Sequence, residues 1–208
     1  MKGTAPTIIV HDHDLPDGLD LGNSVAIDTE TMGLNHLRDR LCLVQISSGD
    51  NSAHLVRIHR DRKPAPNLAR MLADPEIEKI FHFARFDLAA LIHGIGPVHG
   101  PIFCTKIASK LIRTYTDRHG LSELVREILG MELSKQQQSS DWGAENLTPE
   151  QETYAASDVL YLHQIKASLL ERLEREGRLS EAAACFAFLQ TRAELDLSGF
   201  ESMDIFSH

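Results

Sequence analysis

The stretch Val25-Ala26-Ile27-Asp28-Thr29-Glu30-Thr31 places an Asp-x-Glu pair at the end of a short apolar run. Such a run is typical of a buried strand, and strand side chains alternate between faces, so Asp28 and Glu30 are expected to point the same way. Two adjacent carboxylates repel each other unless a cation lies between them, and hard oxygen ligands suit Mg²⁺ or Mn²⁺. Roughly one Asp-x-Glu pair is expected by chance in a chain of this size, so the pair gains meaning only from partners elsewhere.

A third carboxylate follows the next apolar run. Residues 79–83 have the composition of a second buried strand, and Asp87 falls in the first turn of a helix predicted over residues 84–93. The positive end of a helix dipole favours an anion at that position. An ordinary helix-terminal charge is therefore an equally good interpretation of Asp87 taken alone.

A fourth carboxylate lies on a late helix with a clear beginning. Thr148 is a predicted cap, Pro149 takes the first helical position, and Gln151 completes a capping box. Tyr154 and Asp158 are four residues apart on this helix, so they share a face. An isolated Tyr-xxx-Asp pair is usually incidental, but chance rarely produces the whole ordered set.

Composition limits the class of protein. With 208 residues the chain can bury one α/β core and is short for two. A hydrophobic fraction of 42% without an apolar run of ~18 residues predicts a soluble protein with no membrane span. Residues 1–6 lack the features of a signal peptide. Cys42, Cys104 and Cys185 have no disulfide or zinc spacing, so we expect reduced core thiols in a cytoplasmic protein, with a catalytic Cys–His pair as the less favoured alternative.

The formal net charge of −9 bears on the substrate. Binding of long nucleic acid depends on Lys and Arg contacts to phosphates, and such domains are usually basic. An acidic chain can still process nucleic acid if the substrate is short and metal ions bind the phosphate. The basic run at residues 57–63 could supply a local patch, although a solvated loop is the more expected interpretation.

The chain begins with strands and ends with helices, an order that predicts a mixed sheet flanked by helices in a single domain. Strands are predicted at residues 7–10, 24–28, 41–47, 53–58, 79–83 and 101–103. Helices are predicted at residues 66–73, 84–93, 105–113, 120–129, 149–175 and 180–192. Residues 1–20 would form an N-terminal strand and loop. Residues 193–208 carry apolar side chains without periodicity, so we expect this tail to pack on the domain or on a neighbouring subunit.

Taken in order, Asp28-Thr29-Glu30, Asp87 and Tyr154-xxx-Asp158 resemble the three motifs of the DEDDy 3′→5′ exonucleases, the ribonuclease D-like members of the DnaQ superfamily. Residues 39–45, 104–111, 115–121 and 134–142 are similar to blocks of the nano-RNase C branch, small bacterial enzymes that cleave dinucleotides. The resemblance extends from about Ile8 to the C-terminus. It implies a ribonuclease H-like (DnaQ-type) α/β fold, with residues 1–208 forming a single 3′–5′ exonuclease domain.

The resemblance also implies roles for the motif residues. The carboxylates of Asp28, Glu30, Asp87 and Asp158 would hold two divalent metal ions, Mg²⁺ or Mn²⁺, roughly 4 Å apart. Tyr154 would orient the attacking water through its hydroxyl. The sister group has histidine at that place, so Tyr154 assigns the chain to the DEDDy group.

Further residues near the motifs are candidates for substrate binding: Thr29, Leu34, Gln45, His82 and Arg85. Leu34 resembles the wedge that separates the last two bases in this superfamily, and a plain core leucine is an equally good interpretation. Gln45, His82 and Arg85 could hydrogen-bond phosphate or sugar, or could instead satisfy the core. The polar loops at residues 115–119 and 136–142 receive no assigned role.

The leading functional hypothesis is a metal-dependent 3′–5′ exoribonuclease that degrades very short RNA, chiefly 5′-phosphorylated dinucleotides. One alternative is ribonuclease D-like trimming of longer RNA, against which the net charge and the missing accessory domains count. Another alternative is a non-catalytic nucleic-acid-binding module, which would be expected to lack a carboxylate. The sequence leaves RNA against DNA open, because no residue must contact a 2′-OH. The family resemblance and the apolar tail imply a homo-oligomer, with an octameric ring as the family's form.

Overall fold

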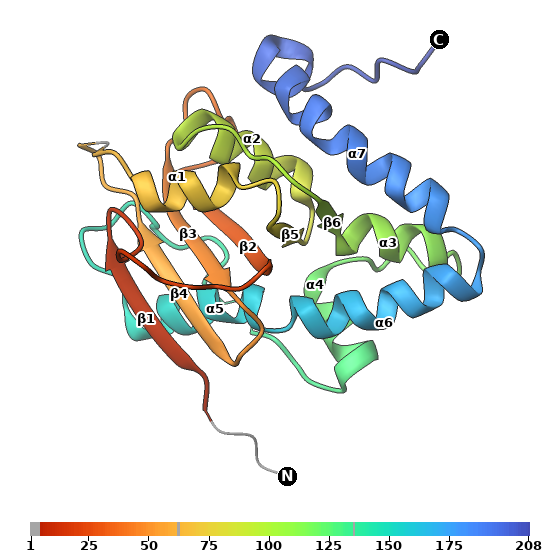
Figure 1. Cartoon of the computed structure of the whole chain (residues 1–208), viewed down its shortest axis with the longest axis horizontal. Helices are drawn as coiled ribbons and strands as arrows, with labels where there is room; N and C mark the ends of the chain where they lie inside the picture. The colour runs from red at the N-terminus through yellow and green to blue at the C-terminus, as the bar shows by residue number, and fades with distance from the viewer. Residues whose placement is uncertain (1–4, 62, 135) are drawn as a thin grey trace.

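The computed structural model describes residues 5–61, 63–134 and 136–208. Residues 1–4 of the predicted N-terminal segment, Arg62 of the basic run and Lys135 of the 134–142 block lie outside the described residues. Six strands form one mixed sheet in the order β1-β4-β3-β2-β5-β6 (Figure 1). The strands are β1 (Thr7–Asp12), β2 (Ser24–Thr31), β3 (Leu41–Ser47), β4 (Ser52–Arg57), β5 (Glu78–Phe81) and β6 (Ile102–Cys104).

Strand β2 lies inside the sheet, antiparallel to β3 and parallel to β5, while β1 pairs in parallel with β4 at one edge. Helices cover both faces. The helices are α1 (Pro66–Ala73), α2 (Ala84–Gly94), α3 (Thr105–Ile112), α4 (Leu121–Leu124), α5 (Pro149–Leu160), α6 (Leu162–Arg175) and α7 (Leu179–Leu195), with π-helical turns η1 (Val125–Leu129) and η2 (Asp196–Phe200). The predicted mixed sheet flanked by helices is confirmed.

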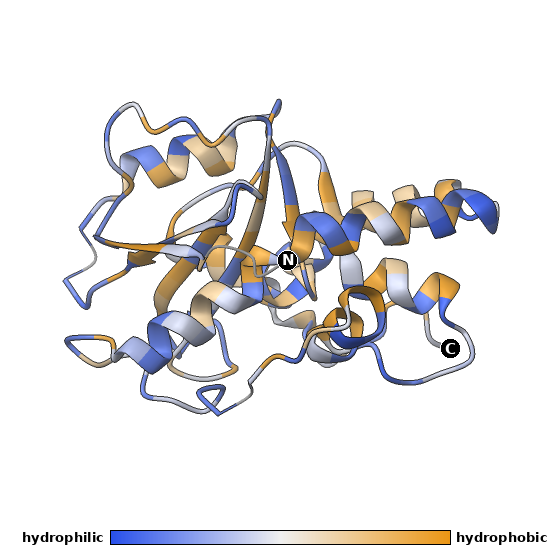
Figure 2. Ribbon diagram, turned by 90° about the horizontal axis from the view of Figure 1, so that it is seen from below, coloured by the Kyte–Doolittle hydropathy of each residue, from blue (hydrophilic) through white to orange (hydrophobic). Residues whose placement is uncertain are grey.

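Two main hydrophobic cores lie between the sheet and the helices on its two faces. One core joins the sheet to α1, α2 and α7, and the other joins it to α3, α4, α5 and α6. Figure 2 shows the strands as largely hydrophobic, whereas the long outer helices alternate apolar and polar segments. The helices α6 and α7 extend beyond the sheet at its β6 end (Figure 1).

The alternation of side chains along β2 decides where the candidate site lies. Ile27 packs into the core beneath α1, α2 and α7, whereas Ala26 packs into the core on the α5 side. Since strand residues alternate with period two, Asp28 and Glu30 share the face of Ala26 and look toward α5. Thr29 lies on the opposite face, toward α2.

Two predicted helices differ from the structure. The helix expected over residues 149–175 is divided at Tyr161, because α5 packs on the sheet whereas α6 packs on α3. Tyr161 is neither Gly nor Pro, so the sequence carries no local signal for the break. The helix expected over residues 120–129 is a short α-helix that continues as a π-helical turn, η1.

One cysteine prediction is also wrong. Cys42 and Cys104 are buried free thiols, as expected, but Cys185 on α7 is exposed, because the helix turns that position away from the core. Among the described residues, no helix combines the length and the apolar character that a membrane span requires.

The segment after α7 folds back on its own chain. The Arg192 guanidinium donates from Nη2 to the carbonyl oxygens of Phe200 at 2.8 Å and Glu201 at 3.2 Å. The ring of Phe206 lies 5.7 Å from that of Phe188, yet Phe206 remains 79% exposed. Apolar surface therefore remains uncovered at the C-terminal end of the described chain.

Candidate active site

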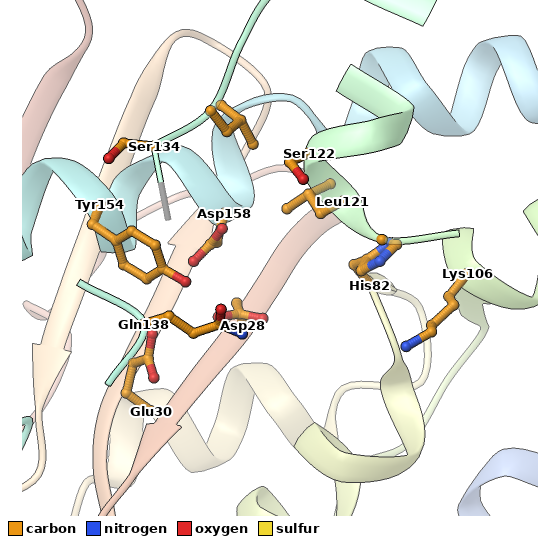
Figure 3. Close-up of a pocket in the computed structure, with 12 residues that line it drawn as sticks. Asp28, Glu30, His82, Lys106, Leu121, Ser122, Ser134, Gln138, Tyr154 and Asp158 are labelled. Atoms are coloured by element: carbon orange, nitrogen blue, oxygen red, sulfur yellow. The ribbon is translucent and has the colours of Figure 1, made fainter. Parts of the chain in front are cut away.

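Three of the four predicted carboxylates meet in one pocket. Ligand atoms of Asp28, Glu30 and Asp158 all lie within 4.8 Å of one another. Asp28 and Glu30 project from β2 and Asp158 projects from α5, so the sheet and one helix together fix the cluster (Figure 3). The three line a cavity of about 320 Å³.

Asp87 approaches from the other layer of the fold. It lies in the first turn of α2, is 3% exposed, and accepts a 2.7 Å hydrogen bond from the Thr29 hydroxyl. Its carboxylate is outside the compact group of three but close enough for the charge of Asp28 to raise its pKa. The fourth carboxylate is thus tied to the cluster through the strand residue between Asp28 and Glu30.

The electrostatics of the cluster favour a cation. Burial raises the pKa of Asp28 to about 7. Burial, together with the charges of Asp28, Asp158 and Asp87, raises the pKa of Glu30 to about 10. Burial and the neighbouring Asp28 also raise the pKa values of Asp87 and Asp158 well above the usual range. Since like charges held together resist ionisation, and carboxylate oxygens suit hard divalent ions, this donor set fits a divalent metal.

Tyr154 lies one helical turn before Asp158, and Figure 3 shows its hydroxyl pointing toward the carboxylates. Burial and the nearby charges of Asp158, Glu30 and Asp28 raise the pKa of the Tyr154 hydroxyl, so the group is protonated and can donate a hydrogen bond. The predicted capping box of α5 is present and fixes the start of the helix. The motif residues of β2 and α5 are therefore brought together as expected.

The opposite end of the pocket is polar and carries a cation. His82, Lys106 and Ser122 line this end, away from the carboxylates (Figure 3). The Nζ of Lys106 lies 4.2 Å from the ring centroid of Phe83, a residue held in the left-handed region at φ 75° in the turn from β5 to α2. Burial and the adjacent Lys106 lower the pKa of His82 to about 3, so this histidine is neutral and Lys106 supplies the positive charge.

Two of the predicted substrate-binding residues instead contact the carboxylates. The Gln45 amide donates to Oδ2 of Asp28 at 3.3 Å, and Gln45 is fully buried. Thr29 is also buried, with its hydroxyl on Asp87. Because neither side chain reaches the pocket surface, the structure assigns both to holding the carboxylates rather than to touching substrate.

Leu34 is 78% exposed, so the interpretation as a plain core leucine is wrong. The loop that carries it is tightly built. Asn35 Oδ1 accepts hydrogen bonds from the backbone of Leu37 and Arg38 at 3.1 Å each. A Cβ added to Gly33 would lie 2.4 Å from Oδ2 of Asp39, so a larger residue there would require the Asp39 side chain to shift. The turn presents the apolar side chain of Leu34 to the outside.

Arg85 does not line the pocket. Its guanidinium donates to both carboxylate oxygens of Asp196, at 2.6 and 2.8 Å, and to the Glu201 carbonyl oxygen at 2.7 Å. Asp196 also pairs with Arg192 at 2.8 Å. These contacts hold the C-terminal segment against α2 and agree with the alternative that Arg85 satisfies the structure; a contact with substrate stays a prediction.

Sequence reasoning missed several residues that line the pocket, among them Lys106, Ser122 and Gln138. Lys106 and Gln138 fall within blocks that resemble the nano-RNase C branch, and this was the available signal. His163, which follows Asp158 by five residues, donates from Nε2 to the Ser24 carbonyl oxygen at 3.1 Å and does not line the pocket. It serves the packing of α6 on β2.

Residues 14–174 match the 3′-5′ exonuclease family, and the chain belongs to that family. Enzymes of this family use divalent metal ions. The predicted ribonuclease D-like assignment within the DnaQ superfamily is confirmed.

Individual proteins within this family are similar to the chain to different degrees. NrnC of Brucella melitensis, solved with bound pGG, is 58% identical, with a TM-score of 0.94 over 98% of this chain and 99% of that chain. The same protein has been solved with bound Mg²⁺. Ribonuclease D of Gluconacetobacter diazotrophicus is 37% identical over 169 residues, which are 81% of this chain and 42% of that protein. Escherichia coli RNase D is 29% identical with a TM-score of 0.73, over 82% of this chain and 45% of that chain. The chain therefore spans about half the length of the curated relatives that it matches.

Proposed function

We propose that this protein is a metal-dependent 3′–5′ exoribonuclease that hydrolyses very short RNA, chiefly 5′-phosphorylated dinucleotides, to nucleoside 5′-monophosphates. The observation that carries the proposal is one cavity with the carboxylates and Tyr154 at one end and Lys106 at the other. A cavity of about 320 Å³ suits a small ligand better than a long strand. The 58% identity to an NrnC solved with pGG supports the same substrate class.

In this proposal Asp28, Glu30, Asp87 and Asp158 hold two divalent ions, Mg²⁺ or Mn²⁺. When bound, such ions lower the pKa of a water and stabilise the charge that develops on the phosphate and the leaving oxygen. Tyr154, kept protonated by its surroundings, donates to the attacking water and orients it. The described residues act as one 3′–5′ exonuclease domain.

The two ends of a dinucleotide would meet different groups. Leu34, exposed on its loop, would separate the two bases by packing between them. Lys106, with Ser122 and the neutral His82 beside it, would bind the 5′ phosphate. A longer strand has no terminal phosphate at that position, so it loses this contact.

A second candidate is ribonuclease D-like trimming of longer RNA 3′ ends. The 37% identity to a ribonuclease D favours it. The net charge of −9 disfavours it, because a long strand needs basic surface for its phosphates. A DNA substrate would fit the same carboxylates, since no described side chain is committed to a 2′-OH.

We also propose that the protein assembles as a homo-oligomer, in the octameric ring that the family resemblance implies. The support is the exposed apolar surface after α7, including Phe206 and Met203. Exposed apolar patches of this kind are commonly covered by a second subunit. Light scattering at micromolar concentration tests this, and a monomer would contradict it.

The decisive experiment is a time course on 5′-labelled RNAs of two to about twenty nucleotides with Mg²⁺ or Mn²⁺, and with EDTA as the metal-free control. We expect rapid loss of the dinucleotide and slow shortening of longer RNA. Faster cleavage of the long substrates would favour the ribonuclease D-like candidate. No cleavage of any RNA with either ion would reject both.

A further inference from the structure

Residues 136–142 form a flap whose far end is fixed to the catalytic helix. Trp142 is 5% exposed, and its ring centroid lies 5.9 Å from that of Tyr154. The Gln151 amide, in the first turn of α5, donates to the Asp141 carbonyl oxygen at 3.2 Å. The flap is therefore anchored on the same helix that carries Tyr154 and Asp158.

A tight turn within the flap determines which of its three consecutive glutamines faces the site. The Ser140 backbone N–H donates to the Gln137 carbonyl oxygen at 3.0 Å, and the Ser140 hydroxyl donates to Oε1 of Gln137 at 2.6 Å. Gln137 is thus used inside the turn. Gln138 occupies the next position, and Gln136 precedes the turn.

The three side chains reach different places. Gln138 lines the active-site pocket, whereas Gln136 and Gln137 line a neighbouring cavity of about 450 Å³. Figure 3 shows Gln138 on the side of the pocket that carries the carboxylates, and Gln138 lines the same pocket as Asp28, Glu30 and Asp158. Among the residues that the structure describes, the Gln138 amide has no hydrogen-bond partner, although its neighbour Gln137 does.

The chemistry of this position is restrictive. A lysine placed among clustered carboxylates would compete with the metal ions for them, and a further carboxylate would repel the phosphate of the substrate. A primary amide does neither, because it is neutral and offers two N–H donors. Phosphate oxygens are acceptors only, so an unpartnered donor beside the carboxylates is suited to the phosphate that those carboxylates and their ions address.

We propose that Gln138 is a substrate-contacting residue, whose side-chain amide donates a hydrogen bond to a non-bridging oxygen of the scissile phosphate and holds it in position from the flap. The proposal rests on the proposed nuclease function. It assigns a role to the 136–142 loop and gives the three glutamines different functions. Gln138 binds substrate, Gln137 forms the turn, and Gln136 is a surface residue.

The test compares Gln138→Ala and Gln138→Glu with the matched control Gln136→Ala in the full-length protein. Steady-state rates are measured on a 5′-phosphorylated dinucleotide with Mg²⁺. We expect Gln138→Ala to lower kcat/KM by about ten- to a hundred-fold and Gln136→Ala to stay within about two-fold of wild type. Gln138→Glu keeps the shape but removes the donor, so it should be at least as impaired as Gln138→Ala.

Two outcomes would overturn the proposal. A Gln138→Ala enzyme within about two-fold of wild type would show that the amide is not needed. A fully active Gln138→Glu enzyme would show that the side chain acts as an acceptor or by packing. To distinguish the loss of a substrate contact from misfolding of the flap, the near-ultraviolet circular dichroism of Trp142 is compared between variants. Gln137→Ala serves as the reference variant in which the turn is disturbed. A changed Trp142 signal in Gln138→Ala would also count against the proposal.

The same variants distinguish this proposal from the proposed substrate. If the wild-type protein does not cleave dinucleotides but shortens longer RNA, the proposed dinucleotidase function is rejected. Gln138 is then tested on that longer RNA, since every substrate of the site presents a scissile phosphate. Loss of rate there would uphold the role of Gln138, and an unchanged rate would reject it.

Discussion

The hydroxyl of Thr29 donates a 2.7 Å hydrogen bond to Oδ1 of Asp87 and thereby joins β2 to α2 across one face of the sheet. Thr29 sits between Asp28 and Glu30, so alternate residues of one strand serve the two layers. Asp28 and Glu30 enter the cluster with Asp158 directly, while Thr29 positions the remaining carboxylate. The middle residue of the Asp-x-Glu motif is therefore part of the site's construction.

Replacing Thr29 with Val should weaken the site without unfolding the protein. Valine has nearly the same shape and favours strands, but it cannot donate to Asp87. We expect kcat to fall by about ten-fold and the Mg²⁺ concentration for half-maximal activity to rise several-fold. A Mg²⁺ titration of the rate measures both. Ser24→Ala, which removes a β2 hydroxyl bound to Glu78, is the control, and equal effects in the two variants would contradict this role.

The parts of this site that sequence could predict are those that follow from local periodicity. Period-two alternation places Asp28 and Glu30 on one face, and helical periodicity places Tyr154 above Asp158. Their meeting depends on packing, which no local pattern encodes. The same limit hides the ion pair of Arg85 from the sequence, because its partner Asp196 is 111 residues away in the chain. The break at Tyr161 has no sequence signal for a similar reason, since it arises because α5 packs on the sheet whereas α6 packs on α3.

The carboxylate cluster should make the metal-free protein less stable as pH rises. The pKa of Asp28 is raised to about 7 and that of Glu30 to about 10, from unfolded values of roughly 4. Between the unfolded and folded values the native state binds more protons than the unfolded state, so the free energy of unfolding falls as pH increases. The window runs from about pH 4 to about pH 7 for Asp28 and to about pH 10 for Glu30.

Thermal unfolding in EDTA between pH 5 and 9 checks this prediction. We expect Tm to fall with pH in wild type, and Mg²⁺ to restore it by binding the ionised carboxylates. Asp28→Asn and Glu30→Gln should raise Tm in EDTA at pH 8, lose the Mg²⁺ effect, and retain less than about a tenth of the cleavage rate. A Tm in EDTA that rises with pH over this range would mean that these groups are not held as like charges.

Tyr154→Phe removes only a hydroxyl. Because the surroundings keep this group protonated, it can orient the attacking water by donation, and its loss should lower kcat by roughly 10²-fold with little change in KM. Near neutral pH, the rate of Tyr154→Phe should depend on pH in the same way as the rate of wild type. An unchanged kcat would assign Tyr154 to packing against Trp142 alone.

Leu34→Ala should reduce activity through loss of contact with the bases. Leu34 and Leu37 lie on the same loop and are 78% and 60% exposed, so neither contributes much to the core. If Leu34 packs between the two bases, its truncation should raise KM for a dinucleotide by about ten-fold, whereas Leu37→Ala should change it less than two-fold. Equal stability of both variants by Tm is the control. Similar kinetics for the two would remove Leu34 from the substrate contacts.

We expect the end of the pocket that carries Lys106 to determine which substrate lengths are preferred. An acidic chain has little basic surface for a long strand, so affinity must come from the metal ions, from Leu34 and from a grip on the terminal phosphate. We expect kcat/KM for a 5′-phosphorylated dinucleotide to exceed that for a heptamer by at least ~10-fold, which corresponds to about 1.4 kcal/mol.

Lys106→Ala should remove most of this advantage but should barely affect a dinucleotide with a 5′ hydroxyl, because the missing charge has no phosphate to bind. Lys110→Ala, one helical turn further along α3 and exposed, is the matched control. If Lys106→Ala slowed the phosphorylated and unphosphorylated dinucleotides equally, the cation would be acting on something other than the 5′ phosphate. If the heptamer were cleaved as fast as the dinucleotide, the pocket would not select for length.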